Sequence, residues 1–394
     1  MSMSRNSKSM DVRVRVTTLL TTCWSPERTF PSGCLPVLRG TEVLLKRIHL
    51  ILSAMMPADN NRRGIISVGN WVVDTIKFID RYPTKGNLTT IARVNEGLGG
   101  CAHNVLVDLA KLRSGIPLYA GGCIGNDDNG RMCLDACVCH GIDASNMHIL
   151  DGESTSYTDV MTETYGGAAR TFFHHRGANA RLGVDEVLSC DTPAKIFHLG
   201  YLLLLDSLDA PDQEYGVAAA RALRGLREKG YKTSVDVVSE EGDRYRQVIL
   251  PCLKYTDYLI INEVELGYCV GRGMRDEDGL IDVAAVSTAA RELLDAGVGN
   301  LVIIHYPEGS VVAERDGRTV SMPSYSPSKE DIVSTVGAGD AFCAGALYAI
   351  HENYPLEELL KFASASARFN LFSSTSTDGA PDVETIRQYY QKNG

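Results

Sequence analysis

The feature that most constrains the fold is a regular alternation of short apolar runs with longer amphipathic segments from Gly64 onward. A parallel strand needs a crossover connection, usually a helix, so this alternation favours a mostly parallel sheet with helices on both faces. We therefore predict an α/β fold, a three-layer sandwich. The expected strands are 65–69, 116–124, 195–199, 232–238, 257–261 and 301–305, and the expected helices include 102–111, 212–229, 242–253 and 283–296.

One region interrupts the alternation. Two β-rich stretches, Tyr157–Thr164 and Arg170–His175, flank the turn Gly166-Gly167, which indicates a hairpin. Residues 75–96 contain turns at Pro83 and Gly86 and would supply partner strands. A hairpin inserted into a parallel α/β unit often covers the site, so we expect a small β lid formed by about 75–96 and 154–176.

The first sixty residues lack this pattern. Met1 to Arg28 is rich in Ser, Thr and Arg and poor in acids, a composition typical of an organellar targeting segment. The alternative is an overextended start, because Met55 and Met56 stand just before the first patterned strand. We therefore treat 1–60 as an N-terminal extension, disordered, targeting or mis-assigned, and 61–394 as one domain carrying the lid.

The net charge of -10 and pI of about 5.4 argue against a nucleic-acid partner. No apolar run is long enough to cross a membrane. The chain has eleven scattered cysteines. Cys133, Cys137, Cys139 and His140 cluster in sequence, but no second pair completes a tetrahedral zinc set. We expect free, buried thiols there and, since reduced thiols are typical of the cytosol, a cytoplasmic protein.

The most informative segment is Gly337-Ala338-Gly339-Asp340, followed by a stretch that is apolar on every side. A glycine turn that leads into a buried helix directs unpaired N–H groups and partial positive charge at one point, which suits an anion. An aspartate there can act as a base while the N–H groups stabilise a transferring phosphoryl group. The alternative is a plain helix cap, for which Asp is also common.

Three motifs, in order, resemble the PfkB or ribokinase-like carbohydrate kinases. The first runs from Gly97 to Leu106, the second is Asn262-Glu263-Val264-Glu265, and the third runs from Gly337 to Gly345. The resemblance covers about residues 64–390. It implies a ribokinase-like fold and an ATP-dependent kinase in which Asp340 is the general base and Gly337, Ala338 and Gly339 form the anion hole.

The resemblance also implies which residues hold the acceptor. In this family the Gly-Gly turn and the following Asn contact substrate hydroxyls, which points to Gly99, Gly100 and Asn104. Asp74 follows the first strand, where the family usually holds an acidic residue on substrate hydroxyls. The alternative for Asp74 is a turn residue at a strand end. Arg176, at the end of the hairpin, is expected to reach the substrate from the lid, with a surface arginine as the alternative.

For the nucleotide side, the resemblance implies ATP and Mg²⁺ as cofactors. Asn262, Thr335, Gly309, Gly337 and Gly339 are expected to bind the nucleotide, and Glu265 the metal, through water. An N-cap followed by a first-turn acid fits Asn262 and Glu265 equally well. Ser334 stands where relatives usually have Asp, which leaves activation by a monovalent cation open. Tyr306 and Pro307 stand in an unusual nucleotide-side loop.

The predicted reaction is transfer of the γ-phosphoryl group of ATP to a hydroxymethyl group of a sugar or sugar-like substrate. A nucleoside kinase on the same fold is the first alternative, with Tyr157, Phe172 or Phe173 stacking on the base. A non-catalytic sugar- or nucleotide-binding regulator is the second. Because an exposed β lid has unpaired strand edges, a homodimer through the lid is also expected.

Overall fold

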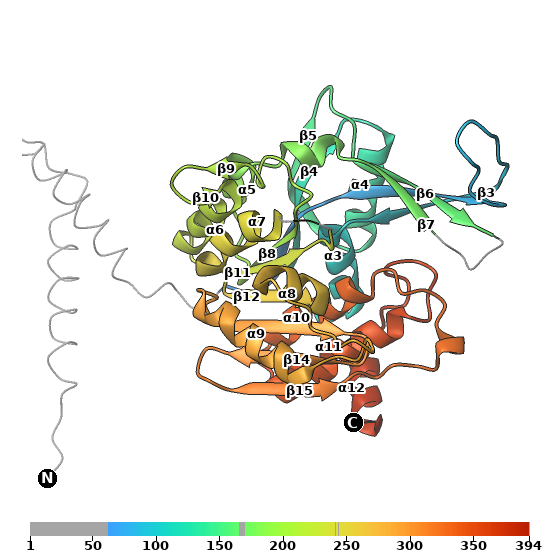
Figure 1. The fold of residues 1–394 in the computed structure, drawn as a ribbon. Helices are drawn as coiled ribbons and strands as arrows, with labels where there is room; N and C mark the ends of the chain where they lie inside the picture. The colour runs from blue at the N-terminus through green and yellow to red at the C-terminus, as the bar shows by residue number, and fades with distance from the viewer. Residues whose placement is uncertain (1–61, 165–169, 241, 243, 394) are drawn as a thin grey trace, which may run out of the picture. The chain divides into compact units, whose positions relative to one another are not determined.

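A computed structural model describes residues 62–164, 170–240, 242 and 244–393. The N-terminal extension 1–60 and the turn Gly166-Gly167, both addressed by sequence-based predictions, lie outside the described residues. The described chain forms an α/β sandwich with a nine-stranded central sheet and a separate four-stranded sheet (Figure 1). The predicted fold class is confirmed.

The central sheet is parallel from β5 to β13 and ends in two antiparallel strands, β14 and β15. In spatial order its strands are β15 (Thr319–Pro323), β14 (Gly309–Glu314), β13 (Leu301–Tyr306), β12 (Tyr258–Asn262), β11 (Lys232–Val237), β8 (Ile196–Leu202), β1 (Ile65–Gly69), β4 (Leu118–Gly125) and β5 (Asp143–Leu150).

Helices cover both faces of this sheet. One face packs against α5 (Val184–Ser189), α6 (Ala218–Glu228), α7 (Arg244–Cys252), α8 (Glu263–Val270) and α9 (Val283–Asp295). The other packs against α3 (Cys101–Lys111), α4 (Asp128–Cys139), α10 (Ala338–His351), α11 (Leu356–Asn370) and α12 (Val383–Asn393). Successive strand residues point to opposite faces, so Ile65 joins one core and Ile66 the other.

The second sheet is the predicted lid. Its strand order is β3 (Ile91–Gly99), β2 (Val72–Ile79), β6 (Tyr157–Glu163) and β7 (Arg170–His175). Strands β3, β6 and β7 extend away from the helical layers (Figure 1). Both edge strands, β3 and β7, are largely exposed.

Two details differ from the sequence-based predictions. Asp74 comes shortly after β1, as predicted, but it lies inside β2, paired with Gly97, and so is not the turn residue of the alternative. The helix expected at 212–229 begins only at Ala218. The Asp212 carboxylate accepts hydrogen bonds from the N–H groups of Glu214 and Tyr215, and Gly216 has a φ of 84°. A turn between two short paired strands therefore precedes the helix.

The thiols of the cysteine cluster were expected to be free and buried. Cys133 and Cys137 are free and buried on α4, whereas Cys139 is free but exposed, so burial was predicted wrongly for that thiol. Within the described residues, no helix is both long and apolar enough to span a bilayer.

Candidate active site

The site is organised around the beginning of α10. Gly337 precedes the helix with a φ of 78°, and a Cβ there would lie 2.3 Å from the carbonyl oxygen of Ser376. Only glycine fits this turn without strain. The first N–H groups of a helix have no partner within it, so the turn presents donors at this point. Asp340 is the third residue of α10 and is 4% exposed.

Two side chains hold the Asp340 carboxylate. The Tyr201 hydroxyl donates to Oδ1 at 2.6 Å, and the Asn104 amide donates to Oδ2 at 2.8 Å. Burial raises the pKa of Asp340, and the hydrogen bonds from Tyr201, Asn104 and Cys101 partly offset this. A buried carboxylate whose pKa is raised towards neutrality is a better base for a hydroxyl proton.

Asn104 connects the glycine turn of α3 to this carboxylate. Gly100 precedes α3 with a φ of 89°, and a Cβ there would lie 2.3 Å from the carbonyl oxygen of Asn70. The Asn104 Oδ1 accepts from the Ser376 hydroxyl at 3.0 Å and lies 2.9 Å from the His103 ring. Asn104 therefore holds the Asp340 carboxylate in position. Its expected contact with substrate hydroxyls stays a prediction.

The lid contributes a second carboxyl group beside the same turn. Asp74 on β2 lies so close to Gly99 that a Cβ at that glycine would be 2.4 Å from its Oδ2. Burial raises the pKa of Asp74 to about 6, and a hydrogen bond from Thr158 partly offsets the shift. The structure thus brings together Asp74 and Gly99, both expected to contact the substrate; that role stays a prediction.

Arg176 lies differently from expectation. Its guanidinium is paired with Asp206 at 2.7 Å and lies 3.4 Å from the Leu203 carbonyl oxygen. Its side chain is 34% exposed. The structure shows Arg176 fixed to the loop that follows β8, and a role toward the substrate stays a prediction.

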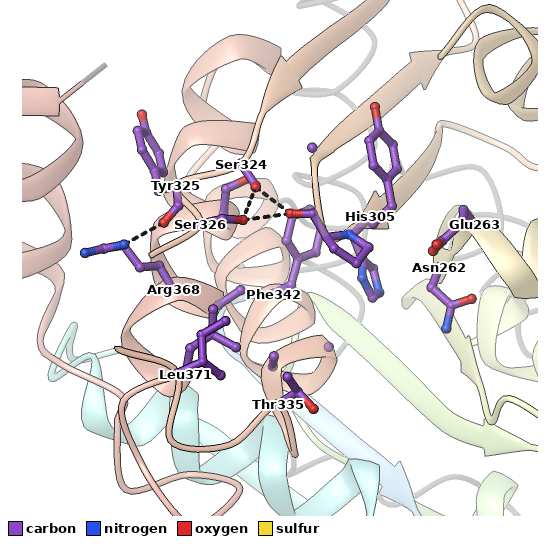
Figure 2. A pocket seen from close by; sticks show the side chains of 18 of the residues that line it. Asn262, Glu263, His305, Ser324, Tyr325, Ser326, Thr335, Phe342, Arg368 and Leu371 are labelled. Atoms are coloured by element: carbon purple, nitrogen blue, oxygen red, sulfur yellow. Dashed lines mark hydrogen bonds between the residues drawn. The ribbon is translucent and has the colours of Figure 1, made fainter. Parts of the chain in front are cut away.

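A cavity of about 370 Å³ opens beside the N-terminus of α10, which contributes Gly339 and Phe342 to its lining (Figure 2). Its lining includes Asn262, Thr335, Gly309, Ala338 and Gly339, residues that the sequence assigned to the nucleotide or the anion hole. Further walls come from the ends of β13 and β14, the loop 324–326 and helix α11. The size and mostly apolar lining suit a small-molecule ligand.

The loop at one end of this cavity is held by its own hydrogen bonds. The hydroxyls of Ser324 and Ser326 donate to the Pro307 carbonyl oxygen at 2.6 and 2.8 Å (Figure 2). Arg368 donates to the Tyr325 carbonyl oxygen at 2.8 Å. Tyr306 and Pro307 line the cavity, so the unusual loop seen in the sequence does shape this pocket.

Asn262 and Glu265 form a helix cap. Asn262 Oδ1 accepts the N–H groups of Val264 and Glu265, and Glu265 Oε2 accepts the Asn262 N–H at 2.9 Å. Glu265 Oε1 accepts from Ser239 at 2.7 Å. Burial raises the pKa of Glu265 to about 7. Glu265 is buried and does not line the cavity, whereas Asn262 does.

Sequence reasoning missed Tyr201 and Ser376. Tyr201 lies at the carboxyl end of β8, the edge of a parallel sheet where ligands bind, and that position was the available signal. Ser376 lies in a loop beyond α11, and nothing in its local sequence indicates that it would reach Asn104.

Comparison with known proteins agrees with this fold. A family model described as pfkB family carbohydrate kinase matches residues 62–383. The chain therefore belongs to the PfkB family of carbohydrate kinases, and it is an enzyme of that class.

Curated relatives match at low identity over most of the chain. A 5-dehydro-2-deoxygluconokinase from Clostridium perfringens is 26% identical over 336 residues, covering 80% of this chain and 90% of the relative. A deoxyribokinase from Salmonella typhi is 23% identical over 338 residues, covering 84% and 99%. The relatives thus act on different acceptors, so the match defines the family and leaves the substrate open.

Solved structures show the same fold. The Arabidopsis thaliana ribokinase complexed with ribose and ATP matches with a TM-score of 0.69 and 21% identity, covering 84% of this chain and 99% of that one. The Burkholderia thailandensis nucleoside kinase in complex with inosine matches with a TM-score of 0.65 and 18% identity, covering 84% and 97%.

Proposed function

We propose that this protein transfers the γ-phosphoryl group of ATP to a hydroxyl group of a sugar or sugar-like acceptor, with Asp340 as the general base. The observation that carries the proposal is the buried Asp340 carboxylate at the N-terminus of α10, next to a cavity of about 370 Å³. The base and the helix N-terminus therefore meet where an acceptor and a phosphoryl group would meet.

In this mechanism Asp340 accepts the acceptor's hydroxyl proton as the oxygen bonds to the γ-phosphorus. The bond from that phosphorus to the β–γ bridging oxygen breaks, and ADP leaves. The N–H groups at Gly337, Ala338 and Gly339 stabilise the charge on the transferring group. Tyr201 and Asn104 hold the base in place through their hydrogen bonds.

The acceptor is proposed to lie between Asp340 and the lid. Asp74, ionised above about pH 6, accepts hydrogen bonds from acceptor hydroxyls beside Gly99 and Gly100. An acceptor that lacks such a hydroxyl would leave this carboxylate unpaired, which disfavours its binding. Arg176 stays a candidate on the same side.

The nucleotide is proposed to occupy the cavity lined by Asn262, Thr335, Gly309 and Gly339. Mg²⁺, when bound to the phosphates, would neutralise part of their charge. The oxygen donors of Asn262 and Glu265 suit this ion, and because Glu265 is buried behind the cavity, contact through water fits best.

A coupled assay of ATP consumption against pentoses, hexoses, keto-deoxy acids and nucleosides tests this proposal. The Asp340→Asn variant is run in parallel, with Asp316→Asn, a change in an exposed turn, as the matched control. One acceptor should drive turnover in the parent and in Asp316→Asn, with about a 10²–10⁴-fold loss in Asp340→Asn. Nucleoside-only turnover would favour the nucleoside kinase alternative, and ATP binding with no acceptor-dependent turnover would favour the regulator.

We also infer that the lid mediates a homodimer. Its edge strands expose Ile91, Val94, Phe172 and Phe173, with exposed fractions of 47%, 50%, 62% and 49%. Edge strands with unpaired backbone N–H and C=O groups and exposed apolar side chains can pair with the edge strand of a second copy of the chain. Light scattering should give twice the chain mass for the parent, and the mass of one chain for Val94→Lys. A monomeric parent would contradict the inference.

A further inference from the structure

Four buried side chains lie close together near the Asp340 carboxylate, and none of them lines the nucleotide cavity. They are Cys101, the first residue of α3; His198 on β8; Asp236 on β11; and Cys343 on α10. Their exposed fractions are 0%, 0%, 7% and 1%. The proposed phosphoryl transfer uses none of them as a reacting group.

The ligating atoms of Cys101, His198 and Asp236 all lie within 4.8 Å of one another. The Cys101 Sγ is 3.4 Å from His198 Nε2 and 3.5 Å from Asp236 Oδ2, and the Cys343 Sγ is 3.9 Å from the same His198 nitrogen. Zinc bonds of about 2.3 Å to sulfur and about 2.0 Å to nitrogen or oxygen place neighbouring tetrahedral ligands about 3.5 Å apart. Cys101, His198 and Asp236 therefore have the spacing of three ligands of one metal ion, and Cys343 lies beside this group.

The surroundings support the same reading. The other ring nitrogen of His198 lies 3.1 Å from the Ser234 hydroxyl, the kind of contact that fixes a metal-binding imidazole. Gly200 leaves room beside the Cys101 sulfur, because a Cβ at this glycine would lie 2.6 Å from that sulfur. Burial disfavours the charged form of Asp236, and so do the nearby carboxylates of Glu265 and Asp340. A cation at this point would offset this like-charge repulsion.

We propose that Cys101, His198 and Asp236 form a buried site for a thiophilic divalent cation such as Zn²⁺, with the neighbouring Cys343 sulfur as the fourth ligand once the ion draws it in. The ion would join α3, β8, β11 and α10, the elements that carry Asn104, Tyr201 and Asp340, and so act as a structural cross-link behind the base. On binding, each thiol loses its proton to solvent, as does Asp236 if it is protonated, and the sulfur and oxygen lone pairs form the bonds to the metal. The site is independent of the magnesium expected with ATP, because thiolates select soft metals.

Cobalt titration of the untagged, reduced full-length chain tests the proposal. We expect one equivalent of Co²⁺ to produce thiolate-to-metal charge-transfer and tetrahedral d–d absorption, with release of protons measured in weak buffer. Zn²⁺ should displace the cobalt and raise the melting temperature. Cys101→Ser and Cys343→Ser should each lose the parent spectrum, whereas Cys133→Ser, buried on α4, and the exposed Cys139→Ser should keep it.

Ser234→Ala provides a test that leaves all four ligands in place. Losing the contact to His198 should weaken metal affinity by about 10- to 100-fold while the spectrum keeps its shape. The proposal is overturned if the parent shows no thiolate band at one equivalent, or if the band persists unchanged in both Cys101→Ser and Cys343→Ser. The cluster would then be a set of hydrogen-bonded thiols only.

Discussion

The hydroxyl of Tyr201 lies 2.6 Å from Oδ1 of Asp340 and donates a hydrogen bond to it. Tyr201 comes from β8 and Asp340 from α10, so the contact joins the central sheet to the helix that begins after Gly337. This hydrogen bond lowers the pKa of a carboxylate that burial otherwise raises. Tyr201 therefore adjusts the basicity of the proposed base.

Removing this donor should move the pH profile. In Tyr201→Phe the pKa of Asp340 rises, so the acidic limb of kcat/KM moves to higher pH. A hydrogen bond to a charged group contributes about 1.5–3 kcal/mol and one pKa unit is 1.36 kcal/mol, so we expect a shift of about one unit or more. Tyr389→Phe is the matched control, because Tyr389 lies on α12 and does not line the nucleotide cavity. An unmoved limb in Tyr201→Phe would contradict this role.

Acceptor binding should depend on the ionisation of Asp74. Burial raises the pKa of this group to about 6, so it is ionised above that pH and protonated below it. Equilibrium binding of the acceptor in the absence of ATP should weaken as the pH drops through about 6, and Asp74→Asn should bind weakly at every pH and lack this dependence. Asp80→Asn, an exposed position directly after β2, should behave like the parent. The experiment is a set of acceptor binding curves across pH, which exclude the catalytic limb of kcat/KM assigned to Asp340. If Asp74→Asn binding still weakened near pH 6, another group would be responsible.

The turn before α10 should tolerate no side chain. Gly337→Ala combines a left-handed backbone, which costs about 1–2 kcal/mol, with a Cβ 2.3 Å from the Ser376 carbonyl oxygen. Gly115→Ala has a similar φ of 73° but no heavy atom within 4 Å of the added Cβ, so it isolates the backbone cost. We expect urea denaturation to show a loss of unfolding free energy of more than about 2 kcal/mol for Gly337→Ala and a smaller loss for Gly115→Ala. Equal losses would mean that the turn relaxes around the added methyl group.

Filling the cavity should affect the nucleotide and not the acceptor. Ala367 on α11 lines the pocket, so Ala367→Phe places a ring where the nucleotide is proposed to bind. The KM for ATP should rise by at least about tenfold, which corresponds to 1.4 kcal/mol, while the KM for the acceptor stays the same. Ala284→Phe, at an exposed position on α9, is the control. If the KM for the acceptor rose instead, the cavity would be the acceptor site and the nucleotide would bind elsewhere.

The sequence by itself determined the α/β class, the lid and the place of Asp340, the proposed base, at the start of a buried helix. The apolar run Ile65–Gly69 and the glycine turn at Gly337 are local features. The backbone conformation of each depends on a few consecutive residues, so the sequence alone indicates it. Short consecutive motifs also carry the family resemblance from which Asn262, Thr335, Gly309 and Gly339 were assigned to the nucleotide. These four residues line one pocket.

Only the tertiary structure decided which side chains surround the base. Tyr201 and Asp340 are 139 residues apart, and Asn104 and Asp340 are 236 apart. The convergence of Cys101, His198, Asp236 and Cys343 likewise depends on how β8 and β11 pair and how α3 and α10 pack over them. Such contacts arise from sheet order and helix packing, which no single stretch of sequence encodes, and they control the burial that raises the pKa of Asp340.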